Sequence, residues 1–110
     1  MSALPLLDAA AGGMAAQRAA LDIAARNVAA AEAAGPRGSY RREVPVFTVR
    51  DAGDGARIAL SGVRSEAADD GALPEMLAVM NASRAYDENA ALFETGKRLA
   101  LQTIELERLP

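Results

Sequence analysis

Residues 83–106 of this chain read SRAYDENAALFETGKRLALQTIEL and contain no proline, so we predict one continuous helix here. At about 100° per residue, the large apolar side chains of this region fall on two faces of that helix. The first face is a leucine line, made of Leu77, Leu92, Leu99 and Leu106. The second stripe lies roughly 120° to 200° away and holds Tyr86, Phe93, Leu101 and Ile104. One helical partner covers one face, so the second stripe predicts contact with other molecules.

The composition predicts one small domain with little core. The chain has 110 residues, of which 51% are hydrophobic but only 4% aromatic, so alanine and leucine dominate the apolar content. Burying an alanine removes little apolar area from water, whereas ordering each residue costs roughly 1 to 2 kcal/mol of backbone entropy. A lone monomer is therefore expected to be marginally stable.

The chain contains no cysteine and no histidine. Ser-His and Cys-His nucleophiles and the usual zinc sites therefore cannot be built, so we predict no enzyme activity, no small-molecule substrate and no cofactor. Acidic residues Glu66, Asp69 and Asp70 match no calcium-loop spacing, and we predict no metal site.

The net charge of −3 and a pI near 4.9 argue against nucleic-acid binding. The basic cluster Arg37, Arg41 and Arg42 is expected to be solvated or paired with local acids such as Glu43. No apolar run approaches the roughly 18 to 20 residues that span a bilayer. The opening MSALPLL is too short for a signal-peptide core, so any export is expected to use another route.

A first helix is predicted over about residues 4–34. Its larger apolar residues recur at a spacing of seven and are Leu7, Met14, Leu21 and Val28. Gly12 and Gly13 weaken this helix or permit a close helix crossing, and Gly35 with Pro36 ends it.

The central segment changes composition. REVPVFTVR (42–50) and ARIALSGV (56–63) flank the turn-forming DAGDG (51–55), which predicts a hairpin of two short strands. Pro45 lacks a ladder donor and is expected to lie against a neighbour or at a sheet edge. A polar linker follows over 65–71, and Asp70 is expected to cap the last helix.

These elements predict a mainly α fold. Helices over 1–34 and 72–110 form one core domain as an antiparallel helical hairpin or coiled coil, and 35–71 is a loop with a small β-hairpin insert at its tip. The leucine line is expected to form the seam against Leu7, Met14, Leu21 and Val28, which leaves the second stripe for neighbouring subunits. The alternative is a four-helix dimer whose β tip covers part of that stripe.

Four polar or aromatic residues are candidates for fixing these contacts. Asn27 and Asn89 are predicted to form hydrogen bonds between helices or subunits, with solvent exposure as the alternative. Arg84 and Tyr86 are candidate interface anchors, although a tyrosine on a helix flank is as often part of the core.

Three segments resemble the flagellar basal-body rod proteins, and within them most resemble the proximal rod subunit. They are MAAQRAALDIAARNVAAAEAAG (14–35), YRREVPVF (40–47) and EMLAVMNASRAYDENAALFETGKRLALQTIEL (75–106). The last contains the family's Ala-Ser-Arg-x-Tyr-x-x-Asn pattern at residues 82–89. The sequence departs from the family at Ala30, where a second Asn is common, in DDGALP (69–74), where Asn-Val-Asp is common, and in its shorter middle.

This resemblance implies a structural subunit of the axial rod that crosses the periplasm in the flagellar basal body. Such a subunit is exported by the flagellar type III apparatus without a cleaved signal peptide and folds on assembly into a helical tube. The implied partners are copies of itself, other rod subunits, the export apparatus and the basal-body ring proteins. The residues that we predict at subunit interfaces are Leu7, Met14, Leu21, Asn27, Val28, Arg84, Tyr86, Asn89, Leu92, Phe93, Leu99, Leu101, Ile104 and Leu106.

Two other classes of function stay open from the sequence. The heptad spacing also suits a small helical adaptor or regulatory protein that dimerises. A small enzyme that uses only carboxylates would need a pocket that an alanine-rich hairpin hardly provides.

Overall fold

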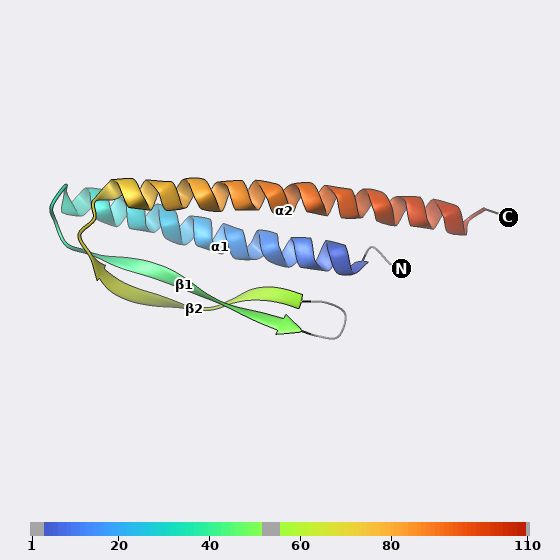
Figure 1. The fold of residues 1–110 in the computed structure, drawn as a ribbon, viewed down its shortest axis with the longest axis horizontal. Coiled ribbons are helices and arrows are strands. Elements are labelled where there is room, and N and C mark those ends of the chain that lie inside the picture. Colours follow the sequence, from blue (N-terminus) through green and yellow to red (C-terminus); the bar gives the residue numbers. More distant parts are fainter. Residues whose placement is uncertain (1–3, 52–55, 110) are drawn as a thin grey trace.

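A computed structural model describes the backbone of residues 4–51 and 56–109, and side chains over 7–50 and 58–109. The elements follow the order α1 (Leu4–Ala34), β1 (Tyr40–Asp51), β2 (Ala56–Ala68) and α2 (Ala72–Glu107). The fold is mainly helical, with two long helices flanking an antiparallel β-hairpin, as the sequence predicts (Figure 1). Residues 52–55 of the predicted DAGDG turn lie outside the described part of the chain.

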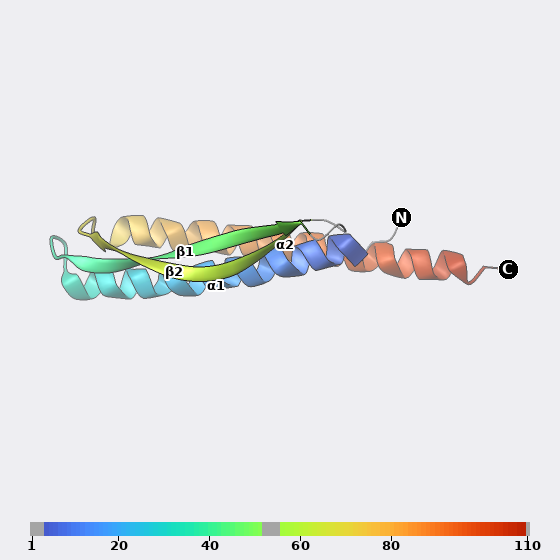
Figure 2. The ribbon, with the colours of Figure 1, turned by 90° about the horizontal axis from the view of Figure 1, so that it is seen from below.

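The two helices run antiparallel, and the β-hairpin folds back alongside them (Figures 1 and 2). The molecule is therefore a rod of 69 × 23 × 12 Å. The prediction of short strands at the tip of the helical hairpin is wrong, because the strands have 12 and 13 residues. A two-stranded ribbon of that length gains stability by packing against a helix, and it lies along α1.

Small residues form the seam between the helices. The buried positions of α2 are Glu75, Ala82 and Gly96, and those of α1 are Ala10, Gly13, Ala16, Ile23, Ala24, Asn27 and Ala31. A Cβ atom on Gly13 would lie 2.8 Å from Asn89 Oδ1, so the close helix crossing permitted by this glycine is confirmed.

The predicted seam is wrong. The residues of the leucine line are 45% to 67% exposed. Their predicted partners on α1 are half-buried: Leu7, Met14, Leu21 and Val28. Larger side chains between the helices would hold the two backbones apart at the Gly13 crossing, so the small residues face inward and the leucines are displaced to the outside.

The true seam of α2 passes through Tyr86 and Phe93, both half-buried. The predicted exposed stripe is therefore wrong for these two residues. Leu101 and Ile104 are exposed, because α2 extends past Leu4, the first described residue of α1 (Figure 1). Ile104 follows Tyr86 by five helical turns and so lies on the same face, but no helix covers it there.

The β ribbon twists strongly, and its strands cross in Figure 1. Near the helix ends, Tyr40 and Arg42 face the helices. The register shifts between Val46 and Phe47. Phe47 is half-buried, whereas the next three residues of β1, Thr48 to Arg50, are exposed. Pro45 is half-buried in a two-stranded sheet that has only edge strands, as predicted.

Glycines shape both ends of the insert. Gly35 has a φ of +85° and donates its N–H to the Ala31 carbonyl at 3.1 Å, which confirms the predicted end of α1. The predicted cap of α2 is wrong: Gly71 occupies the N-cap position without a side-chain hydrogen bond. The Asp70 carboxylate lies 2.6 Å from Arg42 Nη2 instead.

Candidate functional site

A buried carboxylate joins the ribbon to α2. Glu75 begins the seam of α2 and is only 2% exposed. Arg42 on β1 donates from Nε to Glu75 Oε1 at 2.5 Å, and the Tyr40 hydroxyl lies 3.0 Å from the same oxygen. A buried carboxylate requires such partners because the loss of hydration is otherwise uncompensated.

Arg42 also binds two carboxylates from the end of the insert. Its Nη2 reaches Asp70 at 2.6 Å, and its Nη1 reaches Glu66 at 3.3 Å. We call Tyr40, Arg42, Glu66, Asp70 and Glu75 the Arg42 cluster. The cluster connects both strands, the linker and α2 through one guanidinium group.

The cluster perturbs two of its own groups. Hydrogen bonds to Asp70 and Glu75 raise the pKa of Arg42, so it is charged at every pH at which proteins are handled. Burial, and next the hydrogen bond to Glu75, raise the pKa of Tyr40, which keeps the phenol protonated. Arg42 is therefore a cation that faces three carboxylates, and the Tyr40 hydroxyl donates a hydrogen bond to Glu75.

Asn27 fastens the ribbon to α1. Its Nδ2 donates to the Glu43 carbonyl at 2.8 Å, and its Oδ1 accepts from the Glu43 N–H at 2.8 Å. The side-chain amide thereby pairs with the outer edge of β1 as a neighbouring strand would. Arg26 adds a 3.0 Å ion pair to the Glu43 carboxylate.

Sequence reasoning missed Glu75 as a functional position. One signal in the sequence could have identified Glu75. It lies seven residues before Ala82, on the small-residue seam of α2, and a carboxylate at such a position predicts a buried partner. Sequence reasoning also missed that Asn27 binds a strand.

Asn89 was expected to form a hydrogen bond between helices. Its Nδ2 donates instead to the Ala85 carbonyl of its own helix at 3.2 Å, and its side chain packs against Gly13 of α1.

An open groove of about 460 Å³ lies beside the cluster, between α1, β1 and α2. Its walls are mainly apolar, with contributions from Ile23, Pro45 and Ala78. Its polar side chains already bind one another: Asn27 pairs with the Glu43 backbone, and Arg42 pairs with Asp70 and Glu75. Over residues 4–51 and 56–109, no group of three metal-ligating side chains is arranged to hold an ion.

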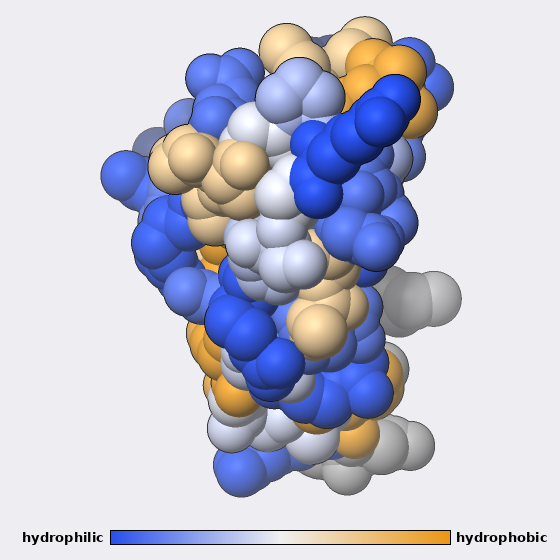
Figure 3. All heavy atoms as spheres, turned by 90° about the vertical axis from the view of Figure 1, so that its left-hand side faces the viewer, coloured by the Kyte–Doolittle hydropathy of each residue, from blue (hydrophilic) through white to orange (hydrophobic). Residues whose placement is uncertain are grey.

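The remaining distinctive surface lies on α2. Its first turns expose Leu73, Met76, Leu77 and Met80, and apolar surface is visible over α2 at the top of Figure 3. Residues 99–109, the α2 tail, extend past α1 and expose Leu99, Leu101, Ile104, Leu106 and Leu109. These side chains point in several directions around the helix, a pattern typical of a helix buried among several neighbours.

The predicted interface residues separate into three groups. Exposed residues are Arg84, Leu92, Leu99, Leu101, Ile104 and Leu106. Half-buried residues are Leu7, Met14, Leu21, Val28, Tyr86, Asn89 and Phe93, and Asn27 is buried. Only the first group is fully presented to other molecules by this chain.

Comparison of the sequence with models of known protein families and with curated proteins gave no match. Among the described residues, neither helix is long and apolar enough to cross a membrane.

Arg42→Ala leaves Glu75 buried without its counter-charge. We expect the free energy of unfolding to fall by about 3 to 5 kcal/mol, or folding to fail if the chain is less stable than that. Arg41→Ala is the matched control, because Arg41 is exposed and its Nε reaches only Ser65 at 3.0 Å; its effect should stay within about 0.5 kcal/mol. Urea unfolding followed by circular dichroism measures both, and equal effects would contradict the role assigned to Glu75.

Asn27→Ala removes both hydrogen bonds to Glu43 and leaves the strand edge without its partner. We expect a loss of about 1 to 3 kcal/mol, and faster hydrogen exchange at the Glu43 amide. Asn81→Ala, at an exposed position of α2, is the control. Unchanged protection of the Glu43 amide in the Asn27 variant would show that the amide pairing does not hold the ribbon.

Proposed function

We propose that this chain is a structural subunit of the bacterial flagellar basal-body rod, most like the proximal rod subunit. In this role its terminal helices pack with neighbouring subunits in a helical axial tube. The observation that carries the proposal is the exposed apolar surface of α2, including the α2 tail that no part of its own described chain covers. The resemblance of the terminal segments to rod proteins supports the same role.

The exposed surface is too extensive to be incidental. Ten large apolar residues of the α2 region are at least 45% exposed: Leu73, Met76, Leu77, Met80, Leu92, Leu99, Leu101, Ile104, Leu106 and Leu109. Scattered exposed leucines are ordinary, but a series along one helix is typical of an interaction surface. Burial of each such side chain contributes about 1.5 to 3 kcal/mol, so association would add stability that the small-residue seam lacks.

The arrangement also suits an open assembly. The molecule is a rod with different surfaces at its two ends and along its two sides, and contacts between unlike surfaces repeat without closing. We propose that the partners are copies of this chain, other rod subunits and the basal-body ring proteins. Delivery through the flagellar export apparatus places it in the periplasm-spanning rod. We propose no catalytic role for this chain.

One observation favours a second candidate. Leu92, Leu99 and Leu106 are all exposed at a spacing of seven, which suits the pairing of two copies into a closed helical dimer. A dimerising adaptor or regulatory protein would use this line alone. Sedimentation velocity separates the candidates: the adaptor stops at a discrete dimer, whereas the rod subunit continues to larger species as concentration rises.

Leu92→Asp with Leu99→Asp tests the proposed role. Both side chains are about half exposed, so the single chain should keep its helical circular dichroism, while self-association weakens by at least about tenfold. In the source bacterium we expect motility to be lost while export of the subunit continues.

The conservative variant Leu92→Met with Leu99→Met keeps the apolar surface and should remain motile. Normal motility with both aspartates in place would contradict a rod role for this face of α2.

A further inference from the structure

The hydrogen bonds of Asn27 show which backbone groups of the ribbon point outward. Asn27 binds both the N–H and the C=O of Glu43, so these two groups point away from β2. Ser65 lies opposite Glu43 in the strand register. When one residue of an antiparallel pair directs its N–H and C=O away from its partner, the partner does the same. The N–H and C=O of Ser65 therefore point away from β1, out of the far edge of β2.

Two neighbours of Ser65 share this edge. Val63 and Ala67 lie two residues before and after it, so their N–H and C=O groups point the same way. Pro45, opposite Val63, fits the pattern, because a proline in a strand belongs where its missing N–H would face outward. Over residues 4–51 and 56–109, no hydrogen bond reaches the outward backbone groups of these three residues. We call Val63, Ser65 and Ala67 the β2 edge.

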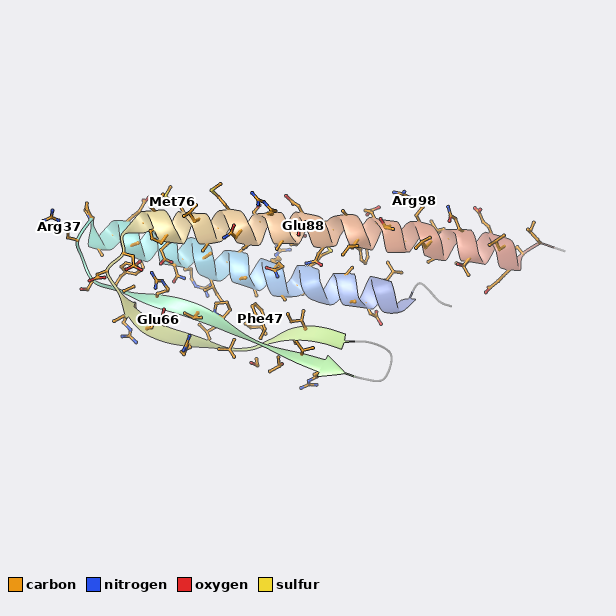
Figure 4. The ribbon with its side chains drawn as sticks, viewed as in Figure 1. Arg37, Phe47, Glu66, Met76, Glu88 and Arg98 are labelled. Carbon is orange, nitrogen blue, oxygen red and sulfur yellow. The ribbon has the colours of Figure 1, made fainter. Side chains whose placement is uncertain are left out.

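The β2 edge lies on the outside of the molecule. In Figure 1, β1 lies between α1 and β2 over this half of the ribbon, so the edge points away from the helices. Its three residues are exposed. Glu66, labelled in Figure 4, belongs to the same stretch, whereas Met76 of α2 is directed to the opposite side of the molecule. A strand of another molecule can therefore reach the β2 edge without displacing a helix.

The charges beside the β2 edge complement themselves. Arg64 and Glu66 flank Ser65 on one face of β2, with side chains 65% and 42% exposed. When two such edges meet antiparallel about Ser65, Arg64 of each copy lies opposite Glu66 of the other, in the closer, non-hydrogen-bonded type of pair.

The neighbouring registers are unfavourable. Sliding one strand by two residues in either direction keeps the backbone hydrogen bonds, but it places Arg64 opposite Arg64 or Glu66 opposite Glu66. Like charges directly opposite each other destabilise a strand pair. The charges therefore select one register, and they favour a second copy of this chain as the partner.

We propose that the β2 edge pairs antiparallel with the β2 edge of a second copy of this chain, about a twofold axis at Ser65. Ser65 then faces Ser65 of the second copy, and Val63 faces Ala67. Each of these is a hydrogen-bonded pair that exchanges two N–H···O=C bonds. Arg64 and Glu66 form ion pairs across the two strands. The two ribbons become one sheet in the order β1-β2-β2-β1.

This pairing stabilises the weakest element of the single chain. A ribbon of two strands is marginal in water, and additional strands stabilise it. Asn27 and Pro45 block the edge of β1 in this half of the ribbon, which leaves β2 as the edge available to a partner. The pairing goes beyond the rod role proposed above and does not require it, because it uses none of the exposed apolar residues of α2.

Cysteine substitutions test the pairing, because the chain has no cysteine of its own. Hydrogen-bonded partners across antiparallel strands have Cα atoms about 5.5 Å apart, a separation that a disulfide spans. The Ser65→Cys chain should therefore oxidise to a cross-linked dimer at least about tenfold faster than a Val49→Cys control. Val49 is 68% exposed and lies on β1 beyond the register shift. Air with copper phenanthroline is the oxidant, and non-reducing electrophoresis measures the rate.

A mixture of two variants tests the register. In the proposed pairing the Val63→Cys position faces the Ala67→Cys position of the second copy. Two Val63→Cys chains place their cysteines four residues apart, about 13 Å, which is too far for a disulfide. We expect rapid cross-linking of the mixture and slow cross-linking of either variant alone.

Charge reversal tests the ion pairs. Arg64→Glu added to the Ser65→Cys chain faces Glu66 of the second copy, so cross-linking should slow by at least about tenfold. Arg50→Glu makes the same change of charge at an exposed position outside the contact and should leave the rate within about twofold. Circular dichroism checks that every variant keeps its helix content.

Three outcomes would overturn the proposal. Equal rates for the Ser65→Cys and Val49→Cys chains would show that the β2 edges do not meet. A Val63→Cys chain that cross-links as fast alone as in the mixture would show another register. Leu92→Asp with Leu99→Asp, added to the Ser65→Cys chain, should leave cross-linking unchanged; its loss would show that the ribbons meet only through α2. Failure of the α2 contacts and failure of the ribbon pairing are thereby distinguished.

Discussion

The close approach of two helices through small residues is the constraint on which this structure depends. Gly13 leaves room for Asn89, and alanine and glycine occupy most of the buried seam positions. Such a seam brings the backbones together but removes little apolar area from water, because the larger leucine side chains cannot enter it. The leucine line is consequently on the outside. The same constraint therefore limits the stability of the single chain and creates the surface that we propose other subunits cover.

Polar contacts supply part of what the seam lacks. The Arg42 cluster and the pairing of Asn27 with Glu43 attach the ribbon to both helices at defined positions. A buried ion pair contributes modestly to net stability, but breaking it is costly, so it selects one position of the ribbon among many sliding alternatives. In that position Arg42 points toward the helices and Arg41 points outward.

The sequence predicts the helices, the insert and the role of Gly35 well, because periodicity and glycine are local signals. It assigns the wrong faces, because a pattern of apolar residues places the largest side chains inward and contains no information about how closely two backbones approach. Tyr86 and Phe93 were expected outside and lie half-buried. Glu75 was not recognised because a glutamate in a first helical turn is ordinarily a solvated residue that favours the helix dipole. Its burial depends on Arg42, 33 residues earlier in the chain.

We propose that one chain is incompletely stabilised and that association completes it. The most direct test is the dependence of thermal unfolding on protein concentration, followed by circular dichroism from about micromolar to millimolar chain. We predict broad, low-temperature unfolding at the lowest concentration, and a midpoint that rises as larger species form. A sharp, cooperative transition of a monomer, with a midpoint independent of concentration, would contradict the account.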